Sequence, residues 1–118
     1  MTIVYWLVRL KPGVTAEEYQ AFVRRVDYPA VTRIASIRTY RSTHVVGAIP
    51  ADQGIPFDFV DVVEVDDLAA YLHDLENHPA VAEVHSQSPN LVEVVHCAIA
   101  EPVSPDPAPS GASGGMAG

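Results

Sequence analysis

The predicted strands of this 118-residue chain are too apolar for a sheet with one face in water. The first strand, Thr2–Leu10, contains five apolar residues in succession from Val4 to Val8, and Phe57–Val65 is nearly as apolar. Successive side chains of a strand point to opposite faces of the sheet, and a sheet with one wet face shows alternating polar residues. Both faces of this sheet must therefore be covered.

The elements expected from the sequence follow the order β-α-β-β-α-β. Thr15 and Glu18 form a capping box before one apolar helical face, and Pro29 should limit that helix. Asp66 and Asp67 begin the second helix, which His78–Pro79 interrupts. Strands are expected at residues 2–10, 37–46, 57–65 and 91–99. The economical fold is α+β, with one four-stranded sheet and both helices on one face.

No element remains to cover the other face of this sheet. We therefore expect a second copy of the chain there, in a homodimer packed sheet to sheet. The folded domain should span residues 1–102. Residues 103–118, rich in Pro, Gly, Ser and Ala, cannot bury enough apolar surface to fold and are expected to form a disordered tail.

Charge and composition narrow the functional classes. The net charge is −8, all seven Lys and Arg lie at or before Arg41, and residues 42–118 carry twelve acidic side chains. This distribution argues against binding of nucleic acid or a phosphate-rich cofactor and favours a small, neutral or mildly charged substrate. No segment has the pattern of a membrane-spanning helix or of an N-terminal signal peptide. Cys97 is the single cysteine, so we expect no disulfide, no cysteine-built metal site and a cytoplasmic protein.

Several segments resemble the stress-responsive dimeric α+β barrel superfamily, namely IVYWLVRLKPGVTAEEYQAFV and DLAAYLHDLENHPAVAEV. More narrowly, VRRVDYPAVTRIASIRTY and FDFVDVVEVDDLAAYLHDL resemble the REDY-like, HapK-type proteins of prodigiosin-class pigment pathways. The resemblance covers nearly all of residues 1–101. It implies a ferredoxin-like subunit with a four-stranded antiparallel sheet, paired into a dimeric α+β barrel, with the substrate in a cavity between sheet and helices.

The resemblance also implies a cofactor-independent protein of secondary metabolism that acts on an aromatic, indole- or pyrrole-type intermediate. The leading function is a cyclase or dehydratase; the alternatives are a non-catalytic binding or chaperone protein for a reactive intermediate and a cofactor-independent monooxygenase. The polyketide-cyclase branch uses a tyrosine and two histidines, and the matching positions here are Leu75, Val81 and Val4. That branch's mechanism therefore does not carry over.

Two aspartates are the leading acid/base candidates. Asp61 interrupts an apolar strand on the face it shares with Phe59 and Val63, where burial would raise the pKa of its carboxyl. The alternative is a rim carboxylate or one that pairs with an arginine. Asp27 is expected at a helix end, where its charge opposes the helix dipole, so a functional role competes with simple turn chemistry.

Two strand histidines are the candidate partners of these carboxyls. His96, expected to be at least half buried, and His44 carry imidazoles suited to proton transfer near neutral pH, although a satisfied core histidine is the commoner role. No histidine spacing is diagnostic of a metal site.

Aromatic residues complete the candidate site. They could wall a pocket for a flat substrate or simply fill the core, and the residues concerned are Trp6, Tyr28, Tyr40 and Phe59.

Overall fold

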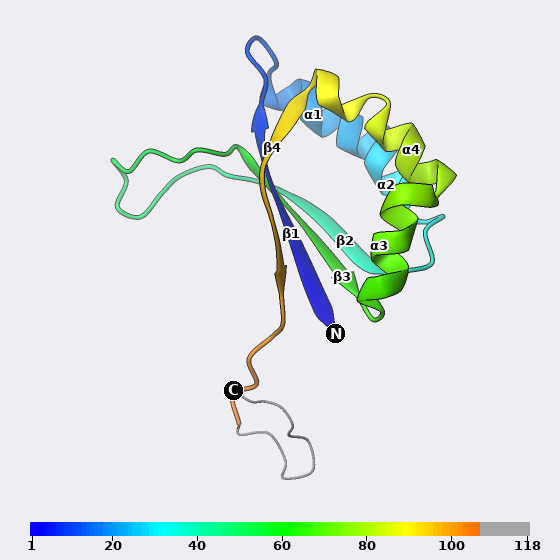
Figure 1. Ribbon diagram of the computed structural model, residues 1–118. Coiled ribbons are helices and arrows are strands. Elements are labelled where there is room, and N and C mark those ends of the chain that lie inside the picture. The colour runs from blue at the N-terminus through cyan, green and yellow to red at the C-terminus, as the bar shows by residue number, and fades with distance from the viewer. Residues whose placement is uncertain (107–118) are drawn as a thin grey trace.

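The computed structural model describes residues 1–106, so most of the predicted tail, residues 107–118, lies outside the described residues. One antiparallel sheet of four strands has the spatial order β2-β3-β1-β4 (Figure 1). Its strands are β1 (Thr2–Leu10), β2 (Ile37–His44), β3 (Phe59–Val65) and β4 (Val92–Ala100). The predicted α+β, ferredoxin-like fold is confirmed.

Strand register fixes which side chains share a face. Trp6 of β1 lies opposite Asp61 of β3 and Cys97 of β4, and the next residue, Leu7, lies opposite His96. The register between β1 and β4 shifts just after Leu7, which leaves β4 with a bulge there. On the other side of β3, Ser42 of β2 lies opposite Asp61. Trp6, Asp61 and Ser42 are thus neighbours across three strands.

The first helical region runs from α1 (Ala16–Phe22) through a π-helical turn (Val23–Asp27) into α2 (Tyr28–Val31). The predicted capping box of Thr15 and Glu18 is present at its start. The prediction that Pro29 limits this helix is wrong. The N–H of Tyr28 bonds the carbonyl of Val23 in the wide turn, and Pro29 then falls in the first turn of α2, where a missing N–H costs little.

The second helical region consists of α3 (Leu68–Asn77) and α4 (Pro79–His85), followed by a 3₁₀ turn at Ser88–Asn90. Asp67 caps α3 by accepting the Ala70 N–H at 3.0 Å. The predicted interruption at His78–Pro79 is confirmed, and the His78 side chain accepts the Ala80 N–H at the start of α4.

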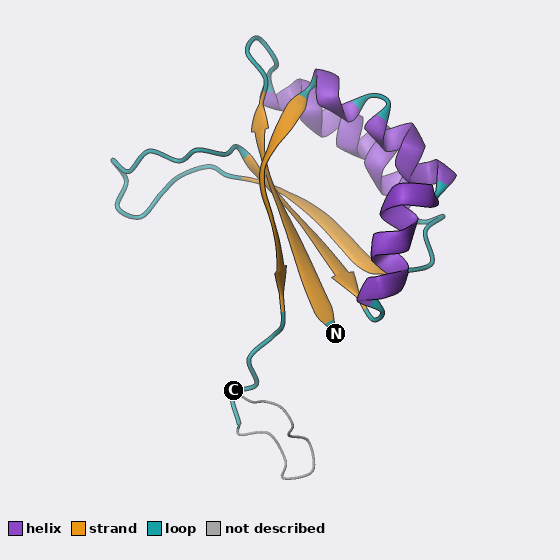
Figure 2. Cartoon of the chain, viewed as in Figure 1, coloured by secondary structure: helices purple, strands orange, loops and turns teal. Residues whose placement is uncertain are grey.

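All the helices lie on one face of the sheet, as Figure 2 shows. Within residues 1–106, no element covers the opposite face, where Leu7, Val60 and Val62 are only half-buried. The loop that joins β2 to β3 extends away from the rest of the domain (Figure 1). None of the helices in residues 1–106 has the length and apolar composition needed to cross a membrane.

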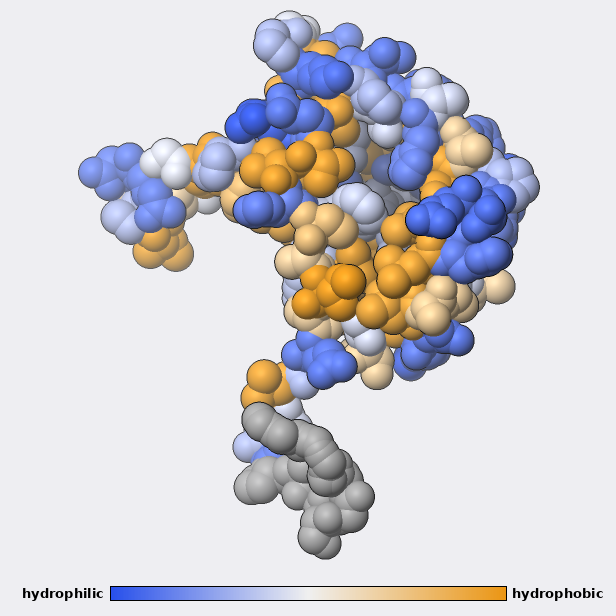
Figure 3. Space-filling view, viewed as in Figure 1, coloured by the Kyte–Doolittle hydropathy of each residue, from blue (hydrophilic) through white to orange (hydrophobic). Residues whose placement is uncertain are grey.

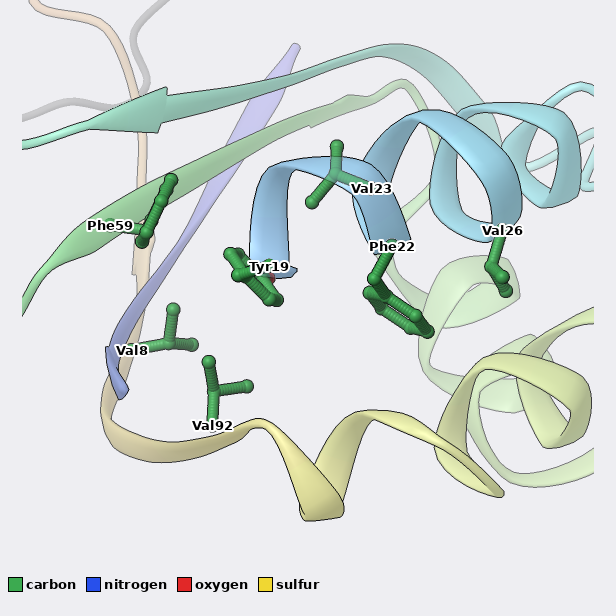
Figure 4. Packing of buried hydrophobic residues seen from close by; sticks show 7 residues of the cluster. All are labelled: Val8, Tyr19, Phe22, Val23, Val26, Phe59 and Val92. Carbon is green, nitrogen blue, oxygen red and sulfur yellow. The ribbon is translucent and has the colours of Figure 1, made fainter. Parts of the chain in front are cut away.

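The core forms where the helices meet the sheet. Its largest group of buried side chains joins α1 and the π-helical turn to three strands (Figure 4), and it contains Val8, Tyr19, Phe22, Val23, Val26, Phe59 and Val92. Tyr19 packs edge-on against Phe59 with ring centroids 4.7 Å apart. This packing holds the first helical region against β1 and β3, and so fixes the position of the side chains described next.

Candidate active site

A cavity of about 150 Å³ lies between the sheet and the helices. Its wall is mainly apolar and includes Ala30, Ile34, Ile37, Val63, Leu75 and Val81. Val94 and His85 line it yet are exposed, so the cavity opens between β4 and the end of α4. Figure 3 shows the surface hollowed between β4 and the helices, with hydrophobic side chains around the hollow. The predicted cavity between sheet and helices is therefore present.

Asp61 lies on β3, faces the cavity and is 5% exposed. Its Oδ2 accepts the Tyr19 hydroxyl at 2.7 Å and its Oδ1 accepts the Ser42 hydroxyl at 2.6 Å. Burial raises the pKa of this carboxyl, while the bonds from Ser42 and Tyr19 oppose that rise. The burial of Asp61 among apolar side chains and the raised pKa agree with the expectation from the sequence. Its partners are hydroxyl groups instead of an arginine.

Asp27 is the second buried carboxyl of the cavity, at 7% exposure. Its Oδ2 accepts the Tyr40 hydroxyl at 2.8 Å, while Oδ1 is buried and has no hydrogen-bond partner among the described residues. Burial raises the pKa of Asp27 to about 6; the Tyr40 bond opposes this rise and the negative charge of Asp61 adds to it. Asp27 is therefore poised to exchange a proton close to neutral pH.

The π-helical turn explains why Asp27 points inward. The sequence predicted Asp27 at a helix end, and that placement is wrong because α2 continues the helix to Val31. A π turn contains one more residue than an α turn, which shifts the following side chains around the helix, and such turns occur frequently at functional sites. Here Val23, Val26 and Asp27 are all buried: the two valines pack in the core, and Asp27 lines the cavity.

Two of the four predicted aromatic residues, Trp6 and Tyr40, line the cavity. The indole N–H of Trp6 donates to the Tyr71 hydroxyl at 3.1 Å, which fixes both rings. Tyr28 is not among the lining residues; its hydroxyl accepts the Ser42 N–H at 3.2 Å and its ring meets Tyr40 edge-on at 5.3 Å. Tyr28 thus supports the site from outside.

The fourth aromatic residue, Phe59, is fully buried in the core behind Tyr19. It packs between the ring of Tyr19 and that of His44, so it also lies outside the cavity wall.

The structure brings neither predicted histidine into the cavity of its own chain. His96 lies opposite Leu7 on the open face of the sheet and is exposed, whereas the sequence predicted it to be at least half buried. His44 stacks on Phe59 with ring centroids 4.6 Å apart and lies 3.5 Å from the Gln20 side chain. The histidine that does line the cavity is His85, at its mouth.

Four residues of the site were not predicted from the sequence: Tyr19, Ser42, Tyr71 and His85. Tyr19 and Tyr71 lie on the apolar faces of their helices, so the sequence pattern indicated that they are core residues. Ser42 shares a face of β2 with Tyr40, and only its register opposite Asp61 shows that the hydroxyl meets a carboxyl. Burial raises the pKa of Tyr71 to about 12 and that of Tyr19 and Tyr40 well above the ordinary value, so all three hydroxyls stay protonated.

The two carboxyls differ in a way that separates their roles. Asp61 receives two hydroxyl bonds, which favour its charged form, whereas Asp27 receives one and lies in the field of Asp61. Acid/base sites often contain two carboxyls whose different environments give them different pKa values. Their titrations belong to the pair as a whole because each charge affects the other.

The sequence profile of the REDY-like protein HapK family matches residues 2–103. The chain belongs to this family. The match covers every strand and helix of the domain, including both carboxyls of the cavity. Membership points to a small-molecule-binding or enzyme-like role. No curated protein sequence gives a significant match.

Solved structures with the same fold include three informative ones. HapK from Hahella chejuensis has a TM-score of 0.74 and 22% identity, with all of both chains covered. A dimeric, ferredoxin-like protein of unknown function from Bacteroides fragilis has a TM-score of 0.63 and 16% identity, over 85% of this chain and 94% of that one. The hydroxynitrile lyase from Passiflora edulis has a TM-score of 0.59 and 18% identity, over 87% and 97%. At these identities the likeness establishes the fold.

Proposed function

We propose that this REDY-like protein is a cofactor-independent cyclase or dehydratase that acts on a small aromatic, indole- or pyrrole-type intermediate of secondary metabolism. The observation that carries the proposal is the pair of buried carboxyls, Asp27 and Asp61, in an otherwise apolar cavity. One structural neighbour is named a hydroxynitrile lyase, so this fold accommodates lyase chemistry.

Asp27 is the proposed acid/base residue. In a dehydration, its ionised carboxylate removes a proton from a substrate carbon and then delivers that proton to the departing hydroxyl, so that water leaves and the carboxylate is restored. In a ring closure, the same carboxyl moves a proton from the attacking atom to the carbonyl oxygen. A pKa of about 6 suits both directions of transfer. Such a positioned acid/base group contributes roughly a hundredfold or more to the rate.

Asp61 is the proposed positioning residue. Tyr19 and Ser42 hold its carboxylate still, and its negative charge raises the pKa of Asp27. Tyr40 donates to Asp27 and is also close enough to Asp61 to favour that carboxylate's charged form, so its hydroxyl couples the pair. Trp6, held by Tyr71, offers an aromatic wall against which a flat substrate can pack.

We also propose that the protein is a homodimer through the open face of its sheet. The apolar, half-buried residues of that face support this, and so does the description of the Bacteroides fragilis neighbour as dimeric. The same pairing would bury His96 at the interface.

The test is a metabolite comparison by mass spectrometry. A strain that lacks this gene is complemented with wild type, Asp27→Asn, Asp61→Asn or Asp66→Asn. Asp66 is an exposed carboxylate that pairs with Arg38 at 3.2 Å, so its substitution is the matched control. We expect the deletion strain to accumulate a precursor that differs from the product by water or by ring closure. Wild type and Asp66→Asn should restore the product, and Asp27→Asn should fail.

Two other outcomes redirect the proposal. If folded Asp27→Asn and Asp61→Asn proteins both restore full product, the acid/base assignment is wrong and the protein binds or protects the intermediate instead. If the missing product contains an added oxygen atom and its formation consumes oxygen, the protein is a monooxygenase.

A further inference from the structure

Within residues 1–106, the two carboxyls of the cavity have no positively charged partner. None of the described residues that line the cavity is a lysine or arginine, and His85 at the mouth is the one nitrogen base among them. In this part of the chain, the side chains that donate to Asp27 and Asp61 are neutral hydroxyls. A buried carboxylate without a counter-charge is costly, because burial withdraws it from water without replacing the lost interaction.

One acceptor of this pair is also unused. Asp27 is 93% buried, since its exposure is 7%, and it lines the cavity, yet no donor in residues 1–106 reaches its Oδ1. Buried polar atoms are nearly always hydrogen-bonded, so an unpaired one at a cavity wall marks a place where a bound molecule donates a bond. The donor that suits a carboxylate best is a charged N–H.

We propose that the cavity selects ligands that carry a protonated nitrogen, such as an ammonium, amidinium or iminium group, which donates to Asp27 Oδ1 and supplies the missing counter-charge. This inference rests on the proposed function and deepens it, since it names the substrate class. A cationic ligand keeps both carboxyls ionised, so Asp27 begins the reaction as the base.

The size and lining of the cavity define the rest of the ligand. A volume of about 150 Å³ is that of a cavity that holds one benzene-sized ring. Trp6, Tyr40 and Tyr71 provide aromatic faces, which attract cations as well as flat rings. Any larger part of the ligand leaves through the opening between β4 and α4, past Val94, which is 53% exposed.

The groups that face Asp27 determine how binding depends on pH. Those that titrate come from five different elements, namely Tyr19, Tyr40, Asp61, Tyr71 and His85. The three tyrosines remain neutral over the working range because burial raises the pKa of each. Binding of a cation should therefore expel the proton of Asp27 when the solution pH lies below its pKa of about 6.

The test compares benzylamine, which is charged near neutral pH, with benzyl alcohol, its neutral analogue. The full chain is titrated with each by calorimetry. A hydrogen bond to a charged group is worth roughly ten- to a hundredfold in affinity, and we expect benzylamine to bind tighter by that factor. Asp27→Asn should abolish this difference, whereas Asp66→Asn should preserve it. At about pH 5.5, benzylamine should release protons on binding, as seen from titrations in two buffers of different ionisation enthalpy.

Equal affinity for the two probes, no binding of benzylamine, or an unchanged preference in Asp27→Asn would each overturn the inference. The metabolite test separates this failure from failure of the proposed function. If Asp27→Asn blocks product formation while the wild type binds both probes with equal affinity, the acid/base role of Asp27 is supported and the preference for a cationic ligand is refuted. If the probes differ but Asp27→Asn restores product, the cavity binds cations without using Asp27 in catalysis.

Discussion

Replacement of Asp27 by asparagine should stabilise the protein at alkaline pH and change it much less at acid pH. The carboxyl has a pKa of about 6 in the folded chain, against an ordinary value of 3.8. Between these values the folded state holds a proton that the unfolded state has lost, so the free energy of unfolding falls as the pH rises. Each pKa unit corresponds to about 1.4 kcal/mol, which gives a loss of about 3 kcal/mol in the wild type by pH 8.

Asparagine cannot ionise and has nearly the same shape, so the variant avoids this loss. Urea denaturation at several pH values between about 3 and 8 provides the free energies of both proteins. The quantity of interest is the stability of Asp27→Asn minus that of wild type. It should rise by about 3 kcal/mol from the acid to the alkaline end, which is a large part of the stability of a small domain.

The comparison between pH values removes any constant cost of the substitution, such as a weaker bond with Tyr40. The exposed control Asp66→Asn should show no comparable rise, since its carboxyl lies in solvent. A stability difference between Asp27→Asn and wild type that stays constant from acid to alkaline pH would contradict a raised pKa of Asp27, because this carboxyl would then titrate alike in the folded and unfolded states.

The remaining predictions concern the support of the site, the core and the open face. Tyr19→Phe removes a donor to Asp61. In urea denaturation it should lower the free energy of unfolding by about 1.5–3 kcal/mol at pH 8 and by less at pH 4. An equal loss at both pH values would contradict the charged state of Asp61. Phe22→Ala leaves a cavity at a fully buried position and should lower the free energy of unfolding by about 3–5 kcal/mol. A loss below about 1 kcal/mol would contradict the core packing. Val62→Glu places a charge on the open face and should convert a dimer to a monomer in light scattering, whereas Val46→Glu in the exposed loop should not; a dimeric Val62→Glu protein would exclude this interface.

The fold was predictable because its signals are local and periodic. Apolar runs indicated β1 and β3, and the capping box of Thr15 indicated where the first helix begins. The π-helical turn was not predictable, since Pro29 after a polar pair is typical of a helix end. A proline in the first turn of a following helix gives the same sequence pattern, and only the hydrogen bond from Tyr28 to Val23 distinguishes the two.

The candidate site was predictable in part for the same reason. Strand alternation alone placed Asp61 on the same face as Phe59 and Val63, and the structure shows that this face is the one that packs against the helices. Asp27 was singled out through an incorrect position in the helix. Ser42 and Tyr19 could not be found, because their role depends on a strand register and a helix-to-sheet contact between residues far apart in the sequence. His96 lies opposite Leu7 on the open face of the sheet. Its burial could not be predicted, because no element of residues 1–106 packs on that face.

The proposed acid/base role of Asp27 is tested most directly by conversion of the accumulated precursor with the purified protein. Extract of the deletion strain is incubated with wild type, Asp27→Asn or Asp66→Asn and no added cofactor, and product is followed by mass spectrometry. We expect wild type and Asp66→Asn to convert the precursor by loss of water or ring closure, and Asp27→Asn to be slower by roughly a hundredfold or more. Conversion by Asp27→Asn at the wild-type rate, or no conversion by wild type, would contradict this role.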